Sequence, residues 1–499
     1  MRSTLERVPV RTEGRRAKGG GGRCLTRPQS GEPALSTSAR GHGVFTVFRG
    51  ARQRRAVLVD AIRSRLWPVP AIGVVLAVAL GVALPELDTA ADEHMPETLA
   101  GYLFGGGADG AREVLAAVAT SLMTVTSLTF SLTLVTLQLA SSQYSPRLLR
   151  TFASDPFVQR TLALFLATFA YALTVLRTIR NATDDSAAFV PRISVTFAYL
   201  LATASVLGLV LFLGHLVRQI RIETMLDHVS ADVLDTVCRT AAPLDEEVAS
   251  VPRLPRIPGH VIVAETSGFL TQIDEEDLLA AASEADALVS LDRPVGSGIV
   301  ANVPIAFCWP AADSGELDED RLASLRKRVA GAVHTGVERT ATQDIGYGLR
   351  QLTDVAIRAL SPGINDPTTA IHALQSCTTV LCEMAGYRLG PRVLSDDDGV
   401  ARVVLPRPDL PELLDLVCTQ PQIYGERDPL VMGGLLVLLR DLAWVVRLPE
   451  HRQAVADRCR RLRASIAAQQ FDSAERTDLD RLATQVAKAL DRHWTPTIA

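Results

Sequence analysis

Four stretches of the chain are apolar over about 20 residues, which is the length that crosses the hydrocarbon core of a bilayer. They lie at residues 66–84, 114–143, 157–176 and 193–217. Inside lipid a helix pairs all of its own backbone groups, whereas an open strand leaves them unpaired. The pattern therefore predicts a polytopic α-helical membrane protein, with four transmembrane helices in a domain spanning residues 51–221.

The second apolar stretch is unusual because hydroxyl and amide side chains run through it, with no Asp, Glu, Lys or Arg between residues 114 and 143. On a helix of about 100° per residue, five of them fall on one stripe. They are Thr120, Thr124, Ser127, Ser131 and Gln138. A second stripe on the opposite side holds Thr126, Thr129, Thr133 and Thr136. Without a charge the stretch lacks the usual mark of a proton relay or ion-coupled pump.

Two interpretations of these stripes stay open. The hydroxyls can bond back to the preceding turn or across to a neighbouring helix, in which case they serve packing. Alternatively, the stripe from Thr120 to Gln138 lines a narrow hydrated path through the membrane. We carry the second interpretation forward as a pore-lining hypothesis.

Positive charge predicts the orientation of the four spans. Six arginines precede the first span, at positions 49, 52, 54, 55, 63 and 65, and Arg218 and Arg221 follow the fourth. Because cytoplasmic flanks are enriched in Lys and Arg, the chain is expected to be multi-pass with both termini in the cytoplasm. Asp155-Pro156 is a start signal for the third helix. His215, near the end of the fourth, is either a pH-sensitive group or an interface residue.

The remainder of the chain has the pattern of a water-facing domain. Residues 222–258 are expected to form a connecting helix and a Pro-rich linker. Residues 259–310 favour a small β-rich module, with a hairpin at 260–274, a short helix at 275–285 and further strands.

Residues 311–499 favour a mainly helical cytoplasmic domain. Its predicted elements are helices at 318–342 and 344–360, strands around 393–405, and helices from 409 to 493. Residues 430–446 are strongly apolar but contain Arg440 and Asp441. We interpret them as a buried core helix and not as a fifth span.

Composition narrows the function classes. The 499 residues carry a net charge of −4, which gives no general case for nucleic-acid binding. Seven dispersed cysteines, without a CxxC pair, indicate neither a disulfide framework nor a zinc site. Residues 1–50 are basic and rich in Gly, Ser and Pro, which is typical of a disordered segment. No catalytic, metal or cofactor motif is found, so we expect neither an enzyme nor a cofactor.

One polar motif stands out at residues 344–374. Arg350, Asp354 and Arg358 follow one another at i,i+4 spacing, which suits surface ion pairs. Asn365 or Asp366 can cap the next helix, while their oxygens or the free N–H groups there could hold an ion. The candidate residues for a ligand or interface role are Asp344, Arg350, Asp354, Arg358, Asn365 and Asp366.

Two long motifs carry a resemblance to a known family. They are SLTFSLTLVTLQLASSQYSPRLLR at 127–150 and DIGYGLRQLTDVAIRALSPGINDPTTAIHAL at 344–374. With these motifs the chain resembles the bacterial predicted-membrane-protein family called domain of unknown function 2254, from the first span to near the C-terminus. The resemblance implies a bacterial cytoplasmic (plasma) membrane protein with a cytoplasmic domain. It implies no activity, ligand or catalytic residue, because that family is uncharacterised.

The leading functional hypothesis is an oligomeric channel- or transport-like protein, in which the second span is central and the cytoplasmic domain regulates it. The alternative is a membrane-anchored sensor or scaffold without conduction. The expected partners are the lipid bilayer and further copies of the chain, while the small ion or ligand is not defined by the sequence.

Overall fold

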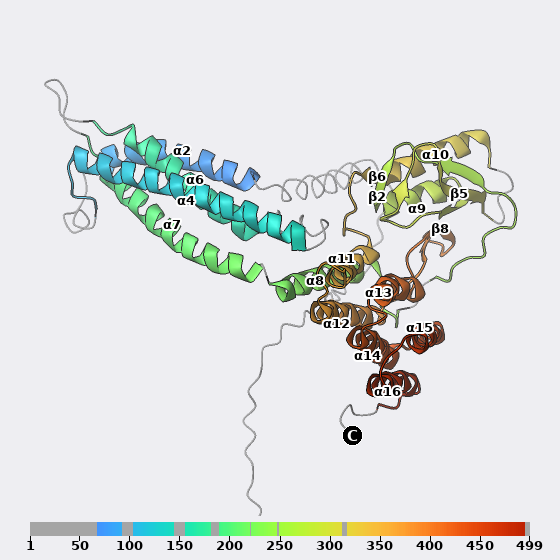
Figure 1. Ribbon diagram of the computed structural model, residues 1–499. Helices are drawn as coiled ribbons and strands as arrows, with labels where there is room; N and C mark the ends of the chain where they lie inside the picture. Colours follow the sequence, from blue (N-terminus) through green and yellow to red (C-terminus); the bar gives the residue numbers. More distant parts are fainter. Residues whose placement is uncertain are drawn as a thin grey trace, which may run out of the picture. The chain divides into compact units, whose positions relative to one another are not determined.

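The computed structural model describes residues 67–91, 103–143, 155–180, 189–219, 221–246, 249–311 and 317–494. The predicted disordered segment, residues 1–50, lies outside these ranges. Four helices in the first half are long and apolar enough to cross a membrane. They are α2 (Pro68–Ala91), α4 (Ala108–Gln143), α6 (Pro156–Leu176) and α7 (Arg192–Gln219), and Figure 1 shows them as an elongated bundle. The predicted fold class is confirmed.

Helix α6 contacts all three other helices of the bundle. Its N-cap forms as predicted, since the Asp155 carboxylate accepts the Phe157 N–H at 2.8 Å and Pro156 opens the first turn. Helix α2 approaches it closely through Gly73 and Gly81. A Cβ at Gly73 would lie 3.3 Å from the Ala163 carbonyl oxygen, and one at Gly81 only 2.9 Å from the Thr174 Cβ. Small residues therefore allow this contact.

A buried carboxylate joins α2 to the start of α7. Asp88, 5% exposed, accepts the Ile193 N–H at 2.8 Å, the Ser194 N–H at 3.0 Å and the Ser194 hydroxyl at 2.7 Å. The Tyr171 hydroxyl donates to the Ser194 carbonyl oxygen at 3.1 Å. Because the first N–H groups of a helix have no partner within it, Asp88 acts as a cap supplied from a neighbouring helix.

The C-terminal part begins with α8 (Ile222–Thr240) and continues into two sheets. One has the order β1-β5-β3-β8-β7 and the other β4-β2-β6. Their strands are β1 (His260–Val263), β2 (Gly268–Ile273), β3 (Ala287–Leu291), β4 (Gly298–Ile299), β5 (Pro304–Pro310), β6 (Val333–Gly336), β7 (Arg392–Ser395) and β8 (Ala401–Leu405). Since β8 lies parallel to β3, the larger sheet extends beyond the segment 259–310.

The predicted hairpin at 260–274 is wrong. β1 pairs with β5, whereas β2 pairs with β4 and β6 in the other sheet. The turn residues between them bond elsewhere, because Ala264 exchanges backbone hydrogen bonds with Val303 and Asn302. Alternation predicts that strands exist, but burial of Ile262 and Leu270 in the finished core decides which strands pair.

The predicted helix 318–342 is too long. Helix α10 (Glu319–Ala332) stops at Ala332, and the chain continues directly as β6 against β2. Val333 and Thr335 are β-branched, which favours an extended backbone once a partner strand is available. Helix α9 (Glu275–Glu284) forms as expected, and both helices pack against the strands.

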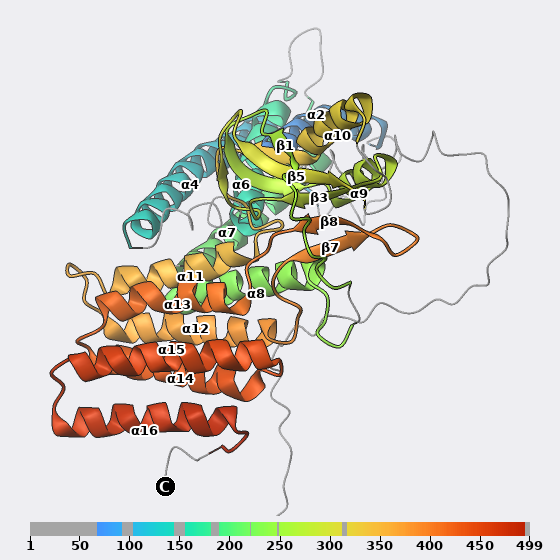
Figure 2. The same cartoon turned by 90° about the vertical axis from the view of Figure 1, so that its right-hand side faces the viewer.

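The C-terminal part also contains a stack of six helices, which lie side by side in Figure 2. They are α11 (Ile345–Ala359), α12 (Pro367–Met384), α13 (Leu410–Tyr424), α14 (Pro429–Val445), α15 (Pro449–Ala468) and α16 (Ser473–Leu490). Their apolar faces and that of α8 form one continuous core. Residues such as Leu435, Leu438 and Leu442 of α14 are fully buried in it. The interpretation of 430–446 as a core helix is confirmed.

The close contact between α2 and α6 generates a first prediction. Gly81→Val should destabilise the membrane part by about 1–3 kcal/mol, the usual cost of overpacking, because its new side chain meets Thr174. Gly214→Val on α7 is the matched control, since a Cβ there comes no closer than 4.0 Å to its neighbours. Thermal unfolding of both variants in detergent gives the comparison. Equal melting temperatures would contradict the packing argument.

A second prediction concerns the buried His451 on α15. Burial lowers the pKa of His451, and its Nδ1 has no hydrogen-bond partner in the described residues. An unfolded chain protonates this imidazole near the ordinary value of 6.5, whereas the folded chain keeps it neutral to lower pH. Stability should therefore fall as pH drops below 6.5 towards the folded-state pKa.

The His451→Leu variant should lose that part of the pH dependence, while His372→Gln at an exposed position should keep it. Unfolding free energies measured at several pH values from about 5 to 8 provide the test. A pH profile of His451→Leu identical to that of the wild type would rule out His451 as the source.

Candidate functional site

The stripe singled out on the second span lies on the surface of the bundle. Thr120, Thr124, Ser127, Ser131 and Gln138 are all exposed on α4. Apolar side chains that are also exposed border the stripe along both of its sides: Met123, Phe130 and Leu134 on one side, and Leu128 and Val135 on the other. The structure thus brings the five predicted residues together as a narrow polar band on an otherwise apolar face.

The opposite stripe has a different environment. Thr129, Thr133 and Thr136 are buried against the rest of the bundle, with at most 8% exposure. The hydroxyls of Thr133 and Thr136 each donate to the carbonyl oxygen four residues earlier, at 2.8 Å. Thr133 and Thr136 therefore have the geometry of the packing interpretation, in which the hydroxyl is satisfied within its own helix. The buried Thr129 hydroxyl has no hydrogen-bond partner among the described residues.

The exposed stripe from Thr120 to Gln138 has hydrogen-bonding groups that the bundle itself does not cover. Hydrocarbon offers no hydrogen-bond partner, so hydroxyl and amide groups at this depth favour contact with water or with another polar helix. The Thr124 hydroxyl bonds back to the Thr120 carbonyl oxygen at 3.1 Å, which covers only part of its capacity. The stripe can line a hydrated path or form a polar contact between helices, and it carries no group that titrates.

His215 and Asp155, each singled out separately, meet at one end of the bundle. The His215 Nε2 lies 2.6 Å from the Asp155 Oδ2, and the imidazole packs against the Phe157 ring at 4.5 Å between centroids. Asp155 is also the N-cap of α6. The pair therefore ties α7 to the start of α6, which is the interface role considered for His215. The sequence contained both residues but no signal that they meet.

In the C-terminal part, Asp344 is a buried carboxylate paired with one guanidinium. The Arg339 Nη2 and Nε lie 2.6 and 3.0 Å from its Oδ2, and Arg339 also covers the Tyr347 ring. Burial raises the pKa of Asp344, and the Arg339 charge offsets part of that rise. Gly296 approaches so closely, at φ +92°, that a Cβ there would lie 1.9 Å from the Asp344 Oδ2.

The other candidate residues of this motif lie on α11 and at the following turn. Arg350, Asp354 and Arg358 are half-buried on α11. Asp366 caps α12 by accepting the Thr369 N–H at 3.1 Å and its hydroxyl at 2.6 Å, contacts that hold the pKa of Asp366 below its ordinary value. Asn365 adopts the left-handed conformation, at φ +50°. These contacts are those of a capped turn between two packed helices.

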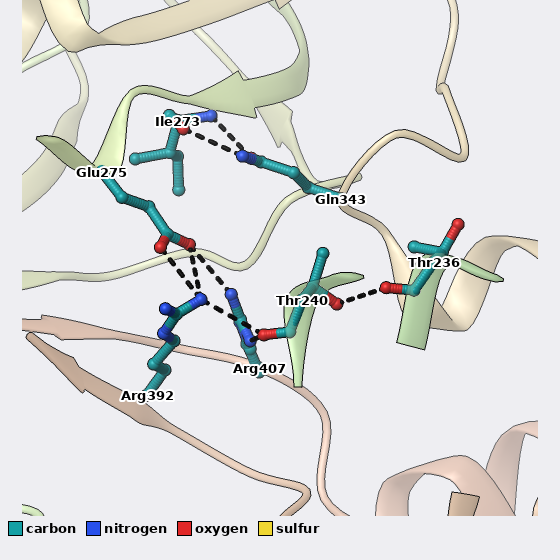
Figure 3. A network of polar contacts seen from close by, with 7 residues as sticks. All are labelled: Thr236, Thr240, Ile273, Glu275, Gln343, Arg392 and Arg407. Atoms are coloured by element: carbon teal, nitrogen blue, oxygen red, sulfur yellow. Dashed lines mark hydrogen bonds and ion pairs between the residues drawn. The ribbon is translucent and has the colours of Figure 1, made fainter. Parts of the chain in front are cut away.

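Sequence reasoning missed a cluster of charged residues that Figure 3 shows around Glu275. Arg392 and Arg407 reach its carboxylate at 3.0 and 2.9 Å, and both guanidiniums also donate to the carbonyl oxygen of Thr240 at the end of α8. These residues come from α9, β7, the loop after β8 and α8. Segments so far apart in the chain carry no shared motif, so only the folded chain reveals the cluster.

Nearby contacts hold the same segments together. The Gln343 side chain bonds both backbone groups of Ile273, at 2.8 and 3.0 Å. The Thr236 hydroxyl of α8 donates to the Ala341 carbonyl oxygen at 2.9 Å. Within the described residues, no group of three His, Cys, Asp or Glu side chains is placed to hold a metal ion.

Four apolar helices followed by this mixed part define an integral membrane protein, and comparison with known proteins gives its family. Residues 63–441 match the model of the family described as predicted membrane protein (DUF2254), and the chain belongs to that family. It is 35% identical over 429 residues to uncharacterised proteins of Mycobacterium tuberculosis H37Rv and Mycobacterium bovis, covering 84% of this chain and 80% of theirs. No solved structure matches.

The contact between Gly296 and Asp344 generates a third prediction. Gly296→Ala should destabilise the C-terminal part by more than the roughly 1 kcal/mol that a left-handed backbone costs an alanine, because the methyl group also displaces the Asp344 carboxylate. Gly399→Ala is the matched control, since Gly399 has a similar φ of +80° but nothing within 4 Å of a Cβ. Urea unfolding of both variants measures the difference, and equal losses would contradict the role of this contact.

Proposed function

We propose that the protein assembles into a homo-oligomer in which α4 lines a narrow hydrated path for a small ion or solute. One observation carries the proposal: all five residues of the predicted pore-lining stripe are exposed on the helix bundle. In a single copy this stripe would face lipid, where its groups find no partner. Assembly around α4 would provide both protein and water for them.

The apolar borders of the stripe support this arrangement. Met123, Phe130 and Leu134 on one side and Leu128 and Val135 on the other can seal contacts between neighbouring copies. The stripe between them carries hydroxyl and amide groups without a charge, which suits passive conduction better than proton-coupled transport. This role requires no catalytic residue, so the proposal is not that of an enzyme.

In the proposed topology the protein is multi-pass in the bacterial cytoplasmic membrane. Four crossings return the chain to the side from which it started, and Arg218 in the last turn of α7 and Arg221 just after that helix favour the cytoplasm for the C-terminal part. Helix α8 follows α7 directly, and its end at Thr240 is held by Arg392 and Arg407. A regulatory signal from the C-terminal part would reach the spans through α8.

The alternative proposal is a membrane-anchored sensor or scaffold. The same polar stripe can form a dry contact between helices of two copies, because hydroxyls bond across helices as well as to water. In that case the spans only anchor and associate the C-terminal parts. Flux measurements separate the two proposals.

A fourth prediction follows for the purified protein in liposomes. The triple substitution of Thr124, Ser127 and Ser131 by Leu should reduce ion flux at least about tenfold. Each of the three substitutions replaces a polar side chain along the path by an apolar one. The matched control replaces Thr126, Thr133 and Thr136 by Val, which keeps side-chain shape on the packed stripe, and should conduct like the wild type. Chemical cross-linking of the wild type and of both variants shows whether each still forms the oligomer.

Two results would contradict the pore. A wild-type protein without flux for several cations and anions, while still oligomeric, would favour the scaffold. Equal flux through wild type and the Leu variant would place any conduction path away from α4.

A further inference from the structure

The exposed face of α4 that carries the polar stripe continues towards the start of the helix. On a helix of about 100° per residue, Asp109 and Glu113 fall within about 20° of Thr120 around the helix axis. Both acids are exposed. Ala116 and Ala117, which lie between Glu113 and Thr120 on this face, are small and exposed as well. The face with the hydroxyl and amide groups therefore leads, past two alanines, to two carboxylates.

These carboxylates lie outside the apolar section of α4, which begins at Val114. At a rise of about 1.5 Å per residue, Glu113 and Gln138 are about 37 Å apart along the helix axis. That length exceeds the hydrocarbon core of a bilayer, which is about 30 Å thick. A helix that spans the core with this face thus has room to keep both acids hydrated at the membrane surface, without the cost of burying a charge in lipid.

The single base of α4 does not cancel both acids. Arg112 lies about 80° from Thr120 around the helix axis, to one side of the stripe. Its Nη2 donates to the Ile179 carbonyl oxygen at 3.2 Å, and its Nη1 lies 3.6 Å from the Asp109 Oδ1. Since the Asp109 side chain is 87% exposed, solvent screens that pair strongly. Two acids against one base leave this end of the stripe with net negative charge.

The stability of the helix accounts for only one of the two acids. Asp109 is in the first turn of α4, where a carboxylate complements the positive end of the helix dipole. Glu113 lies one turn further along, where that effect has largely faded. Its place on the stripe therefore needs another explanation, and the charge that it adds to the entrance of the stripe provides one.

We propose that Asp109 and Glu113 form the extracytoplasmic entrance of the path along α4 and make that path selective for small cations over anions. This inference rests on the proposed function, because only an oligomer around α4 brings the carboxylates of several copies together. There they form rings of negative charge, as in cation channels. Such rings concentrate cations at the entrance and repel anions.

The test is the reversal potential of the full chain in planar lipid bilayers, with a gradient of potassium chloride across the membrane. The wild type should conduct K⁺ in preference to Cl⁻. The preference should weaken when the salt is raised from about 0.1 M to about 1 M, because the Debye length falls from about 10 Å to about 3 Å. A wild-type path that prefers Cl⁻, or that does not discriminate at the lower salt concentration, would overturn the proposal.

Variants of the two acids connect the selectivity to the stripe. Glu113→Gln keeps the shape of the side chain and should lower the permeability ratio of K⁺ to Cl⁻ about threefold at low salt, because it removes one ring of charge. Adding Asp109→Asn should lower the ratio further. Glu113→Lys should lower it more than Glu113→Gln, because it reverses the charge of the ring.

The matched control is Glu86→Gln on α2. It removes the same charge from an exposed position at the same end of the bundle, where Leu84 of α2 and Ala108 of α4 pack into one apolar cluster. It does not lie on α4, and its permeability ratio should equal that of the wild type. Thermal unfolding in detergent verifies that Glu86→Gln and Glu113→Gln are folded like the wild type.

Two outcomes would overturn the selectivity and leave the pore in place. One is conduction with an unchanged permeability ratio in the variant that combines Asp109→Asn and Glu113→Gln. The other is an equal fall of the ratio in Glu86→Gln and Glu113→Gln, which would mean a general effect of surface charge. A wild-type protein that conducts no ion at all is a different result, because it would overturn the proposed pore together with its selectivity.

Discussion

Each polar group inside the four apolar helices has to find a partner, because hydrocarbon offers none. Asp88 meets this requirement by accepting three hydrogen bonds from the first turn of α7. Asp155 meets it through the N-cap of α6 and the contact with His215. Thr133 and Thr136 of α4 bond to their own preceding turn. These contacts join the ends of the helices, while small residues such as Gly73 and Gly81 let the middle pack closely.

Against that background the exposed stripe of α4 is the exception. Its five residues are placed on the outside of the bundle, whereas Asp88, Asp155, Thr133 and Thr136 have partners within it. A folded single copy thus leaves one unsatisfied surface at membrane depth, and association with further copies or with water would satisfy it. The proposed function follows from this one mismatch between side chains and solvent.

In the C-terminal part, contacts between charged side chains join segments that are distant in the chain. Helices α8 and α9, strand β7 and the loop after β8 meet where Glu275, Arg392 and Arg407 lie together (Figure 3). Contacts of this kind join segments more than a hundred residues apart, such as Arg407 and the Thr240 carbonyl oxygen.

The sequence by itself determined the elements that depend on local patterns. Long apolar runs determined the four spans, and Asp155-Pro156 determined the start of α6. The charged pair Arg440 and Asp441 identified residues 430–446 as a core helix and not as a fifth span. Periodicity also placed Thr120 to Gln138 on one stripe. These features are readable because each depends on residues within a few turns of one another.

Only the tertiary structure decided which partners those elements find. It replaced the expected hairpin by two separate sheets, turned Val333–Gly336 into a strand, and distinguished the exposed stripe of α4 from the buried one. It also brought Glu275 to Arg392 and Arg407, and His215 to Asp155. The physical reason is that strand pairing, burial and ion pairing depend on the whole core, so residues distant in the chain carry no local signal of their contact.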